Sequence, residues 1–315
     1  MIVFSAKVAD KHQEKLIKTF PEQQFIFGET DAEVERHLEK AEVYVTYGND
    51  VTKELLEKAP NVKWIACLSA GVDGFPFERL KEKGILLTNA RGIHKTQMAE
   101  YAIAMLLQVY RNSKTIIENE RHSKWDKGVR VQEITGKTLL ILGTGAIGGE
   151  TARLAKAFQM NVIGISRSGK AAEHFDEVYN TAELLHILPK ADLIVSVLPS
   201  TEETKQLLTY EHFKAMKESA VFLNMGRGDV LVEEDLLRAI RNEEIGHAVL
   251  DVFKEEPLPK EHGFWKEENI TITPHISGLS PEYVKRALDI FHKNLTVYVS
   301  NKGEYINKID LTRGY

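Results

Sequence analysis

The chain lacks the features that mark a special class of protein. It contains one cysteine among its 315 residues, so no disulfide can form within it, and it does not open with the charged, apolar and small-residue series of a signal peptide. No apolar run approaches the roughly 18 residues of a membrane span. The longest, residues 102–107, lies in a helix-like pattern and is better explained as core. We therefore expect a cytoplasmic protein without a membrane segment.

A strong charge of either sign is also lacking. The formal net charge is −5, the signs are mixed, and no basic stripe is present, so we expect no nucleic-acid partner. With 43% apolar and 28% charged residues the composition is that of a globular protein, and the length is enough for two domains with their own cores. Cys67 is best explained as a small buried strand residue, with a thiol near a substrate loop as the alternative. We predict no metal site.

Short β-like runs alternate with amphipathic helical segments in two series, which predicts parallel sheets. The first series comprises residues 2–6, 24–27, 43–47, 63–68 and 85–89, and the second 138–143, 161–166, 193–198, 220–225, 247–252 and 270–274. Six parallel strands fit a dinucleotide-binding fold. Residues 94–118 contain neither proline nor glycine and predict one long linking helix, and residues 282–300 predict a C-terminal amphipathic helix.

The clearest single motif is GTGAIG, with Gly143, Gly145 and Gly148, which follows an apolar strand and precedes a helical segment. This order lets backbone amides and a helix N-terminus meet a pyrophosphate. Residues 164–171, GISRSGKA, nearly match the phosphate loop of nucleotide hydrolases, but Ala171 lacks the hydroxyl that would bind magnesium. We therefore predict a dinucleotide site.

The residues after the second strand of this unit bear on the choice of cofactor. In NAD-specific proteins a carboxylate about 20 residues after the glycines binds the ribose 2′-hydroxyl. Here the strand runs into Ser166, Arg167 and Ser168, with Lys170 nearby and no carboxylate. A guanidinium and hydroxyls suit a 2′-phosphate, which predicts a preference for NADP. The alternative is that Arg167 is a solvated strand-end charge and NAD is used.

Three motifs follow in order: Arg227 in NMGRGDV, Glu256 in DVFKEEP and His275 in TPHIS. Each alone has an ordinary explanation, as a surface turn, a solvated charge or a strand-end residue. Together they supply a cation for a carboxylate, an acid for a carbonyl oxygen, and a carboxylate that keeps this acid protonated, which reduction of a 2-keto acid needs. On composition alone Glu255 could take the place of Glu256.

Six segments resemble the D-isomer-specific 2-hydroxyacid dehydrogenase family and span nearly the whole chain: LSAGVDG (68–74), GTGAIG (143–148), LPSTEET (198–204), NMGRGDVL (224–231), DVFKEEPLP (251–259) and TPHISG (273–278). The sequence is most similar to the NADP-dependent branch that includes glyoxylate/hydroxypyruvate reductases. The resemblance implies two Rossmann-like, doubly wound α/β domains. Residues 1–97 and 286–315 would form a discontinuous, flavodoxin-like substrate domain around a dinucleotide-binding domain of residues 98–285.

The resemblance also implies roles for single residues. The family's equivalent of Arg227 binds the substrate's carboxylate and carbonyl oxygen, that of His275 is the general acid, and that of Glu256, directly before a proline, bonds the far imidazole nitrogen. The loop Ser69, Ala70 and Gly71 would bind the substrate carboxylate through backbone amides, in a cleft that closes between the domains, a plain turn being the alternative. Cofactor contacts are implied for Gly143, Thr144, Gly145, Ala146, Ile147, Gly148, Ser166, Arg167, Ser168, Leu198, Pro199, Thr204, Met225, Gly226, Asp251, Ser277 and Gly278. Ser277 departs from the alanine of many relatives.

The activity implied is NAD(P)-dependent reduction of a small 2-keto acid to a D-2-hydroxy acid by a homodimer joined through the cofactor domain. Residues 98–118 and the following loop would contribute to that interface, unless Trp125 merely packs locally. Alternatives are a dinucleotide-sensing binding protein of the corepressor type, and 3-phosphoglycerate dehydrogenase, against which stands a chain that ends at Tyr315 without a further regulatory domain. The substrate stays open. Residues 47–49 are expected near the pocket, where Gly48 would leave space for a longer substrate.

Overall fold

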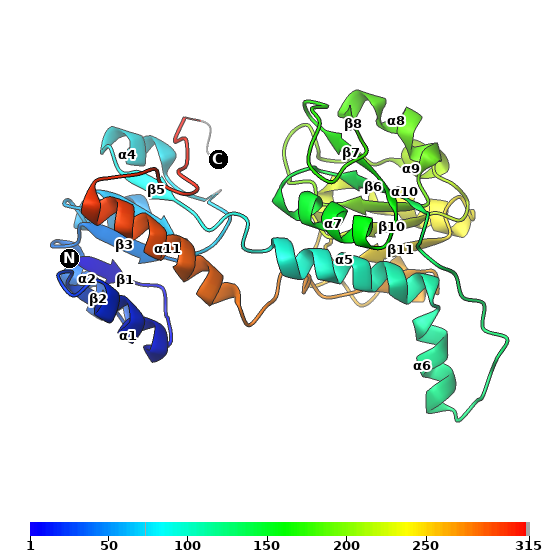
Figure 1. Ribbon diagram of the computed structural model, residues 1–315, viewed down its shortest axis with the longest axis horizontal. Coiled ribbons are helices and arrows are strands. Elements are labelled where there is room, and N and C mark those ends of the chain that lie inside the picture. The colour runs from blue at the N-terminus through cyan, green and yellow to red at the C-terminus, as the bar shows by residue number, and fades with distance from the viewer. Residues whose placement is uncertain (73, 313–315) are drawn as a thin grey trace. The chain divides into compact units, whose positions relative to one another are not determined.

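The computed structural model describes residues 1–72 and 74–312; Asp73 of the LSAGVDG segment and residues 313–315 of the expected substrate domain lie outside the described part. The chain divides into two compact units (Figure 1). Unit 1 is Met1–Ile93 together with the segment from Ser280 onward, and unit 2 is His94–Leu279. The boundaries expected from the sequence, after residues 97 and 285, lie a few residues further along the chain.

Unit 1 contains a five-stranded parallel sheet in the order β2-β1-β3-β4-β5. This is the doubly wound order known from flavodoxin. The strands are the apolar runs of the first series. Because β1, β3 and β4 are buried on both faces, their sequences are continuous apolar runs rather than alternations of apolar and polar residues. The elements are β1 Ile2–Phe4, α1 Asp10–Thr19, β2 Phe25–Phe27, α2 Asp31–Leu38, β3 Val43–Thr46, α3 Lys53–Lys58, β4 Trp64–Cys67, α4 Phe77–Glu82, β5 Leu86–Thr88 and α11 Tyr283–Ser300.

The C-terminal helix α11 packs on the sheet of unit 1. Its Phe291 is 2% exposed, and its ring lies 5.5 Å from that of Trp64 in β4 and 5.4 Å from that of Phe4 in β1. Burial of one such aromatic side chain contributes about 1.5–3 kcal/mol, so this face stabilises the packing of the helix on the sheet. Unit 1 is therefore discontinuous in sequence.

Unit 2 contains a seven-stranded parallel sheet in the order β12-β11-β10-β9-β6-β7-β8. The sequence predicted six strands; the missed one, β8, is a short edge strand, Glu177–Asn180, with no buried residue and hence no apolar run to reveal it. The other elements are α5 Lys95–Tyr110, α6 Ser113–Arg121, β6 Thr138–Leu142, α7 Ala146–Ala157, β7 Asn161–Ser166, α8 Leu184–Ile187, β9 Leu193–Ser196, α9 Tyr210–Lys214, β10 Val221–Asn224, α10 Glu233–Arg241, β11 His247–Leu250 and β12 Ile270–Ile272.

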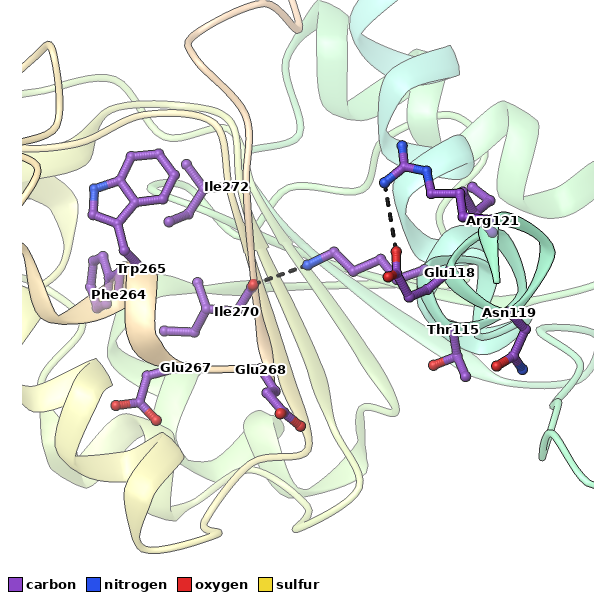
Figure 2. Close-up of a pocket in the computed structure, with 12 residues that line it drawn as sticks. Thr115, Glu118, Asn119, Arg121, Phe264, Trp265, Glu267, Glu268, Ile270 and Ile272 are labelled. Carbon is purple, nitrogen blue, oxygen red and sulfur yellow. Dashed lines mark hydrogen bonds and ion pairs between the residues drawn. The ribbon is translucent and has the colours of Figure 1, made fainter. Parts of the chain in front are cut away.

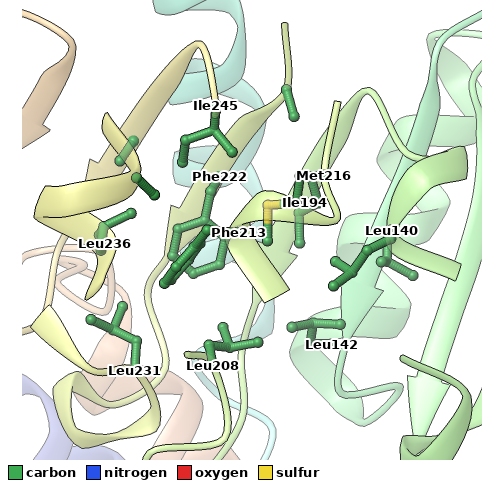
Figure 3. Close-up of a cluster of buried hydrophobic side chains, with 14 of the residues drawn as sticks. Leu140, Leu142, Ile194, Leu208, Phe213, Met216, Phe222, Leu231, Leu236 and Ile245 are labelled. Atoms are coloured by element: carbon green, nitrogen blue, oxygen red, sulfur yellow. The ribbon is translucent and has the colours of Figure 1, made fainter. Parts of the chain in front are cut away.

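One core of unit 2 lies between its sheet and helices α9 and α10. Leu140, Ile194 and Phe222 from neighbouring strands belong to one cluster with Phe213 of α9, and all four are fully buried (Figure 3). The rings of Phe213 and Phe222 meet edge to face at 5.6 Å. Both sheets are parallel and most of their strands are buried, so the prediction of two α/β domains is confirmed.

The single linking helix predicted for residues 94–118 is wrong, because the chain forms two helices. α5 ends at Tyr110 and α6 begins at Ser113, with Asn112 between them at φ 51°. Asparagine tolerates this left-handed conformation better than most residues, so the break needs no glycine. α5 packs against α7, whereas α6 has no buried residue and stands away from the sheet of its own unit (Figure 1). Among the described helices, none combines the length and apolar character needed to cross a membrane.

Candidate active site

The predicted site residues of unit 2 follow the carboxyl ends of its strands. Because all seven strands are parallel, these ends lie along one edge of the sheet. The order of the strands reverses between β6 and β9, and ligands of open α/β sheets bind at such a switch point. The residues that follow the strand ends are Gly143 after β6, Arg167 after β7, Leu198 after β9, Met225 after β10, Asp251 after β11 and Thr273 after β12.

The glycine turn has the close approaches that its residues predict. Gly143 has φ 106°, and a Cβ on Gly148 would lie 1.9 Å from the carbonyl oxygen of Gly143. A Cβ on Gly145 would meet nothing within 4 Å, so the turn is open on this side. The amide of Gly149 bonds the carbonyl of Gly145 at 2.7 Å, which leaves the amides before it without partners in helix α7. A pyrophosphate fits such a cradle.

Arg167, which follows β7, carries a positive charge at the end of this strand. Arg167 is exposed and makes no hydrogen bond or ion pair with any residue that the structure describes. The hydroxyls beside it shape the turn: Ser166 accepts from the amide of Gly169 at 3.2 Å, and Ser168 from that of Lys170 at 3.4 Å. The guanidinium is thus available to an anion.

The loop after β9 is tied to itself and lies against the next strand end. Thr204 donates to the carbonyl of Pro199 at 2.6 Å and accepts from the amide of Thr201 at 2.8 Å. A Cβ on Gly226 would lie 2.5 Å from the carbonyl oxygen of Leu198, so only glycine fits after Met225. The two predicted segments, 198–204 and 225–226, are therefore in contact.

The two glycines that flank Arg227 are required by packing. A Cβ on Gly228 would lie 2.0 Å from the carbonyl carbon of Phe253, and Gly226 is confined by the loop after β9. Asn224, fully buried, donates to the carbonyl of Arg227 at 2.9 Å and accepts from the amide of Gly226 at 3.2 Å. The sequence did not predict these two hydrogen bonds, although Asn224 is the first residue of the NMGRG motif. The Arg227 side chain is exposed, and its guanidinium donates to the carbonyl of Gly226 at 2.8 Å.

His275 and Glu256 form a direct pair. The Nδ1 atom of His275 lies 2.7 Å from Oε2 of Glu256, and Oε1 of the same carboxylate accepts from the amide of Phe253 at 2.9 Å. Glu255 is exposed and has no partner among the described residues. The choice between the two glutamates thus falls on Glu256 in the structure as well.

The electrostatics favour an ionised Glu256. Partial burial works against its charge, but the hydrogen bonds from His275 and the Phe253 amide, together with the positive charges of His275 and Arg227, lower the pKa of this carboxyl. Arg227, Glu256 and His275 therefore share one charged environment although they follow three different strands.

Asp251 organises the segment that carries His275. It is fully buried, and its Oδ1 accepts from the hydroxyl of Thr273 at 2.6 Å and from the amide of Ile276 at 2.9 Å. Its Oδ2 accepts from the amide of Ser277 at 2.9 Å, and its carbonyl accepts from the amide of His275 at 2.9 Å. A buried carboxylate is costly unless bonded in this way.

The loop Ser69–Gly71 belongs to unit 1. Ser69 donates to the carbonyl of Gly71 at 3.1 Å, and Asn89 donates to the carbonyl of Ala70 at 2.6 Å. Among the described residues, no acceptor meets the backbone amides of Ala70 and Gly71. Those amides can accept an anion.

The space expected beside Gly48 is filled. A Cβ there would lie 3.0 Å from the ring of Phe75 and 3.3 Å from the sulfur of Cys67, at a φ of 105°. Gly48 therefore makes room for the protein's own side chains rather than for a longer substrate. Cys67 is a buried strand residue, and burial raises the pKa of its thiol.

A cavity of about 740 Å³ lies elsewhere in unit 2, between α6 and residues 264–272 (Figure 2). None of the predicted site residues lines it. Lys114 lines it and donates to the carbonyl of Ile270 at 3.1 Å. In the part of the chain that the structure describes, no group of three or more His, Cys, Asp or Glu side chains could hold a metal ion.

Comparison with known proteins decides the family. Residues 103–277 match the model of the D-isomer specific 2-hydroxyacid dehydrogenase, NAD binding domain. The chain belongs to the D-isomer specific 2-hydroxyacid dehydrogenase family. As a member of this family it is an oxidoreductase with a nicotinamide dinucleotide-binding domain.

Curated relatives of this dehydrogenase include a glyoxylate reductase from Thermococcus litoralis, 35% identical over 83% of this chain and 82% of the relative. A D-3-phosphoglycerate dehydrogenase from Methanocaldococcus jannaschii is 32% identical over 87% of this chain, which spans only 52% of that longer protein.

Among solved structures, a D-isomer specific 2-hydroxyacid dehydrogenase family protein from Aeromonas salmonicida has a TM-score of 0.85 at 35% identity, with 98% of both chains covered. An NADPH-dependent glyoxylate/hydroxypyruvate reductase from Sinorhizobium meliloti, solved with NADP and sulfate, has a TM-score of 0.80 at 27% identity over 100% of this chain and 99% of that one.

Proposed function

We propose that this dehydrogenase is an NADPH-preferring reductase that converts a small 2-keto acid, of the glyoxylate or hydroxypyruvate type, into the D-2-hydroxy acid. The observation that carries the proposal is the 2.7 Å pair of His275 and Glu256, in the same unit as the exposed Arg227 and the open glycine turn. The bound dinucleotide would supply a hydride to C2 of the keto acid.

His275 is the proton donor in this proposal. Its Nδ1 faces the ionised Glu256, so its Nε2 is left for the substrate, and a proton on Nε2 would pass to the carbonyl oxygen as C2 accepts the hydride. The carboxylate stabilises the doubly protonated ring and fixes which nitrogen points outward. In the reverse direction Nε2 would take the proton back.

The substrate's carboxylate needs a cation and oriented donors. We assign it to the guanidinium of Arg227, which can bind a carboxylate through two parallel hydrogen bonds. In unit 1, the unpartnered amides of Ala70 and Gly71 are donors that we assign to anion binding.

The dinucleotide would be held by the glycine turn and by the strand-end residues beside it. The cradle that a Cβ on Gly148 would fill, and the open amides before Gly149, suit a pyrophosphate. The free guanidinium of Arg167 and the hydroxyl of Ser168 suit a 2′-phosphate, which supports NADP over NAD. The glyoxylate/hydroxypyruvate reductase that resembles this chain was solved with NADP.

We also propose a homodimer joined through unit 2. Helix α6 has no buried residue, and Trp125, in the loop that follows it, is 88% exposed rather than packed locally. Apolar side chains of Trp265, Ile117 and Ile272 line the nearby cavity (Figure 2). Exposed apolar side chains beside such a cavity are typical of a protein interface. Light scattering tests this: a monomer at micromolar concentration would refute the dimer.

The initial rate of NADPH and NADH oxidation with glyoxylate, hydroxypyruvate, pyruvate, phenylpyruvate and 2-ketoisocaproate tests the activity. We expect saturable oxidation that favours NADPH and the smaller keto acids. Equal or higher rates with NADH would refute the proposed binding of the 2′-phosphate by Arg167. Tight cofactor binding without turnover of any keto acid would refute the reductase and favour a dinucleotide sensor.

A further inference from the structure

Helix α5 contacts both ends of the segment that carries His275. Tyr101 places its hydroxyl 2.7 Å from the hydroxyl of Thr273, and Gln97 donates its side-chain amide to the carbonyl of Gly278 at 3.1 Å. Residues four apart on a helix lie on the same face, so Gln97 and Tyr101 hold positions 273 and 278 from one side. His275 lies between these two attachment points.

The direction of the hydrogen bonds at Thr273 is fixed by counting protons. The hydroxyl of Thr273 has one proton, which it donates to Oδ1 of Asp251 at 2.6 Å. The bond between Tyr101 and Thr273 must therefore use the proton of Tyr101. The result is a chain in which Tyr101 donates to Thr273 and Thr273 donates to Asp251.

Asp251 carries this chain to the backbone beside His275. Its carboxylate accepts the amides of Ile276 and Ser277, both at 2.9 Å. His275 itself has φ 53°, a left-handed conformation that a residue with a side chain rarely adopts and that its surroundings must enforce. The hydrogen bonds from these two amides to the carboxylate of Asp251 hold the backbone at His275 in this conformation.

We propose that Tyr101 and Thr273 are positioning residues that hold His275 in the geometry needed for proton transfer. The inference rests on the proposed function, because it assumes that His275 is the proton donor. Neither side chain would touch the keto acid: each acts through the carboxylate of Asp251. Burial raises the pKa of Tyr101, which keeps its hydroxyl protonated as a donor across the working range.

The variants are Tyr101→Phe, Thr273→Val and Thr273→Ser. Tyr101→Phe removes the first donor only, whereas Thr273→Val keeps the shape of the side chain but removes the proton that Asp251 accepts. A displacement of the proton donor by about 1 Å costs roughly 100-fold in rate. We expect kcat with glyoxylate to fall by about 3- to 10-fold in Tyr101→Phe and by about 10- to 100-fold in Thr273→Val, with Thr273→Ser close to wild type.

Measurements other than kcat distinguish a positioning role from a general loss of structure. KM for glyoxylate and the affinity for NADPH should stay within about twofold, and the isotope effect with deuterated NADPH should rise as chemistry becomes slower. Tyr110→Phe is the matched control, because Tyr110 is a 5% exposed tyrosine on the same helix whose hydroxyl bonds no described residue. It should leave kcat and the isotope effect unchanged.

A measurement without substrate keeps this test separate from that of the function. Hydrogen exchange of the peptide covering residues 273–279 should accelerate in Thr273→Val and not in Tyr110→Phe, since the amides of Ile276 and Ser277 depend on Asp251. If the wild type turns over no keto acid, the proposed function fails. In that case, exchange in Thr273→Val that matches the wild type would also overturn the positioning role. If the wild type is active, wild-type kcat in Thr273→Val, or a loss that Thr273→Ser does not rescue, overturns it.

Discussion

Replacement of Glu256 by glutamine tests the pair with His275 most directly. The carboxylate uses both oxygens: Oε1 accepts from the amide of Phe253 and Oε2 from Nδ1 of His275. A glutamine offers one acceptor and one donor in the same volume. If the oxygen of the glutamine accepts from the amide of Phe253, its NH2 group faces Nδ1 of His275. Two donors cannot bond each other, so Nδ1 would have to be unprotonated and the ring could not carry two protons. If the amide flips, two donors meet at Phe253.

The size of the effect follows from the exposure of the pair. A positioned general acid contributes about 10²–10⁴ to a rate. The side chains of His275 and Glu256 are 52% and 35% exposed, so water screens their attraction and the loss should lie at the lower end of that range. We expect kcat for keto-acid reduction to fall about 100-fold at pH 7, which is about 2.7 kcal/mol in the barrier.

The assay is the initial rate of NADPH oxidation at pH 7 for the wild type, Glu256→Gln and Glu255→Gln. Glu256→Gln should be about 100-fold slower than the wild type, because the acceptor that holds Nδ1 of His275 and leaves Nε2 for the substrate is lost. Glu255→Gln, at an exposed neighbour without a partner, should match the wild type. A Glu256→Gln enzyme with a rate within threefold of wild type would refute the reasoning.

The remaining predictions concern the substrate, the cofactor and stability. Arg227→Ala should raise KM for the keto acid and lower kcat/KM by about 100-fold or more, because a charge-assisted pair is lost, while the affinity for NADPH stays the same. Unchanged kinetics would show that Arg227 does not bind the substrate. Arg167→Asp should shift the kcat/KM ratio of NADPH to NADH toward NADH by about tenfold, and no shift would mean that the 2′-phosphate is bound elsewhere. Burial, helped by the charge of Lys114, lowers the pKa of His247 from 6.5 to about 4. The neutral ring is thus favoured in the folded state, so the stability it contributes is complete above pH 6.5 and is lost as pH falls toward 4, by up to about 3 kcal/mol. Urea unfolding of His247→Gln should show a smaller loss between pH 7 and pH 5 than the wild type, and equal losses would contradict the assignment.

Local sequence signals predicted the features that depend on a few neighbouring residues. The apolar runs located the strands of both sheets except β8, whose residues are half-exposed and carry no such run. The glycine turn was visible because its close approach, Gly148 against Gly143, excludes every other residue type. The helix break at Asn112 was missed because only the backbone reveals that this asparagine is left-handed.

Within the candidate site the sequence indicated the reactive groups but not the side chains that hold them. Asn224 braces Arg227 through two hydrogen bonds, yet by itself it reads as one more polar residue at the end of a strand. Tyr101 reads as part of an amphipathic helix, although its hydroxyl meets Thr273, 172 residues away in the chain. No periodicity or spacing encodes a contact across that separation.

The sequence by itself determined the class of fold and the dinucleotide motif, and it predicted Arg227, Glu256 and His275 as candidate groups, because strand runs, glycine turns and reactive side chains are properties of short segments. Only the tertiary structure decided which groups meet. It paired His275 with Glu256 rather than Glu255, filled the space beside Gly48 with Phe75, and made Asp251 a buried anchor. These outcomes depend on parallel strands that bring distant segments to one edge of a sheet, where packing and hydrogen bonding choose among partners that the sequence leaves equivalent.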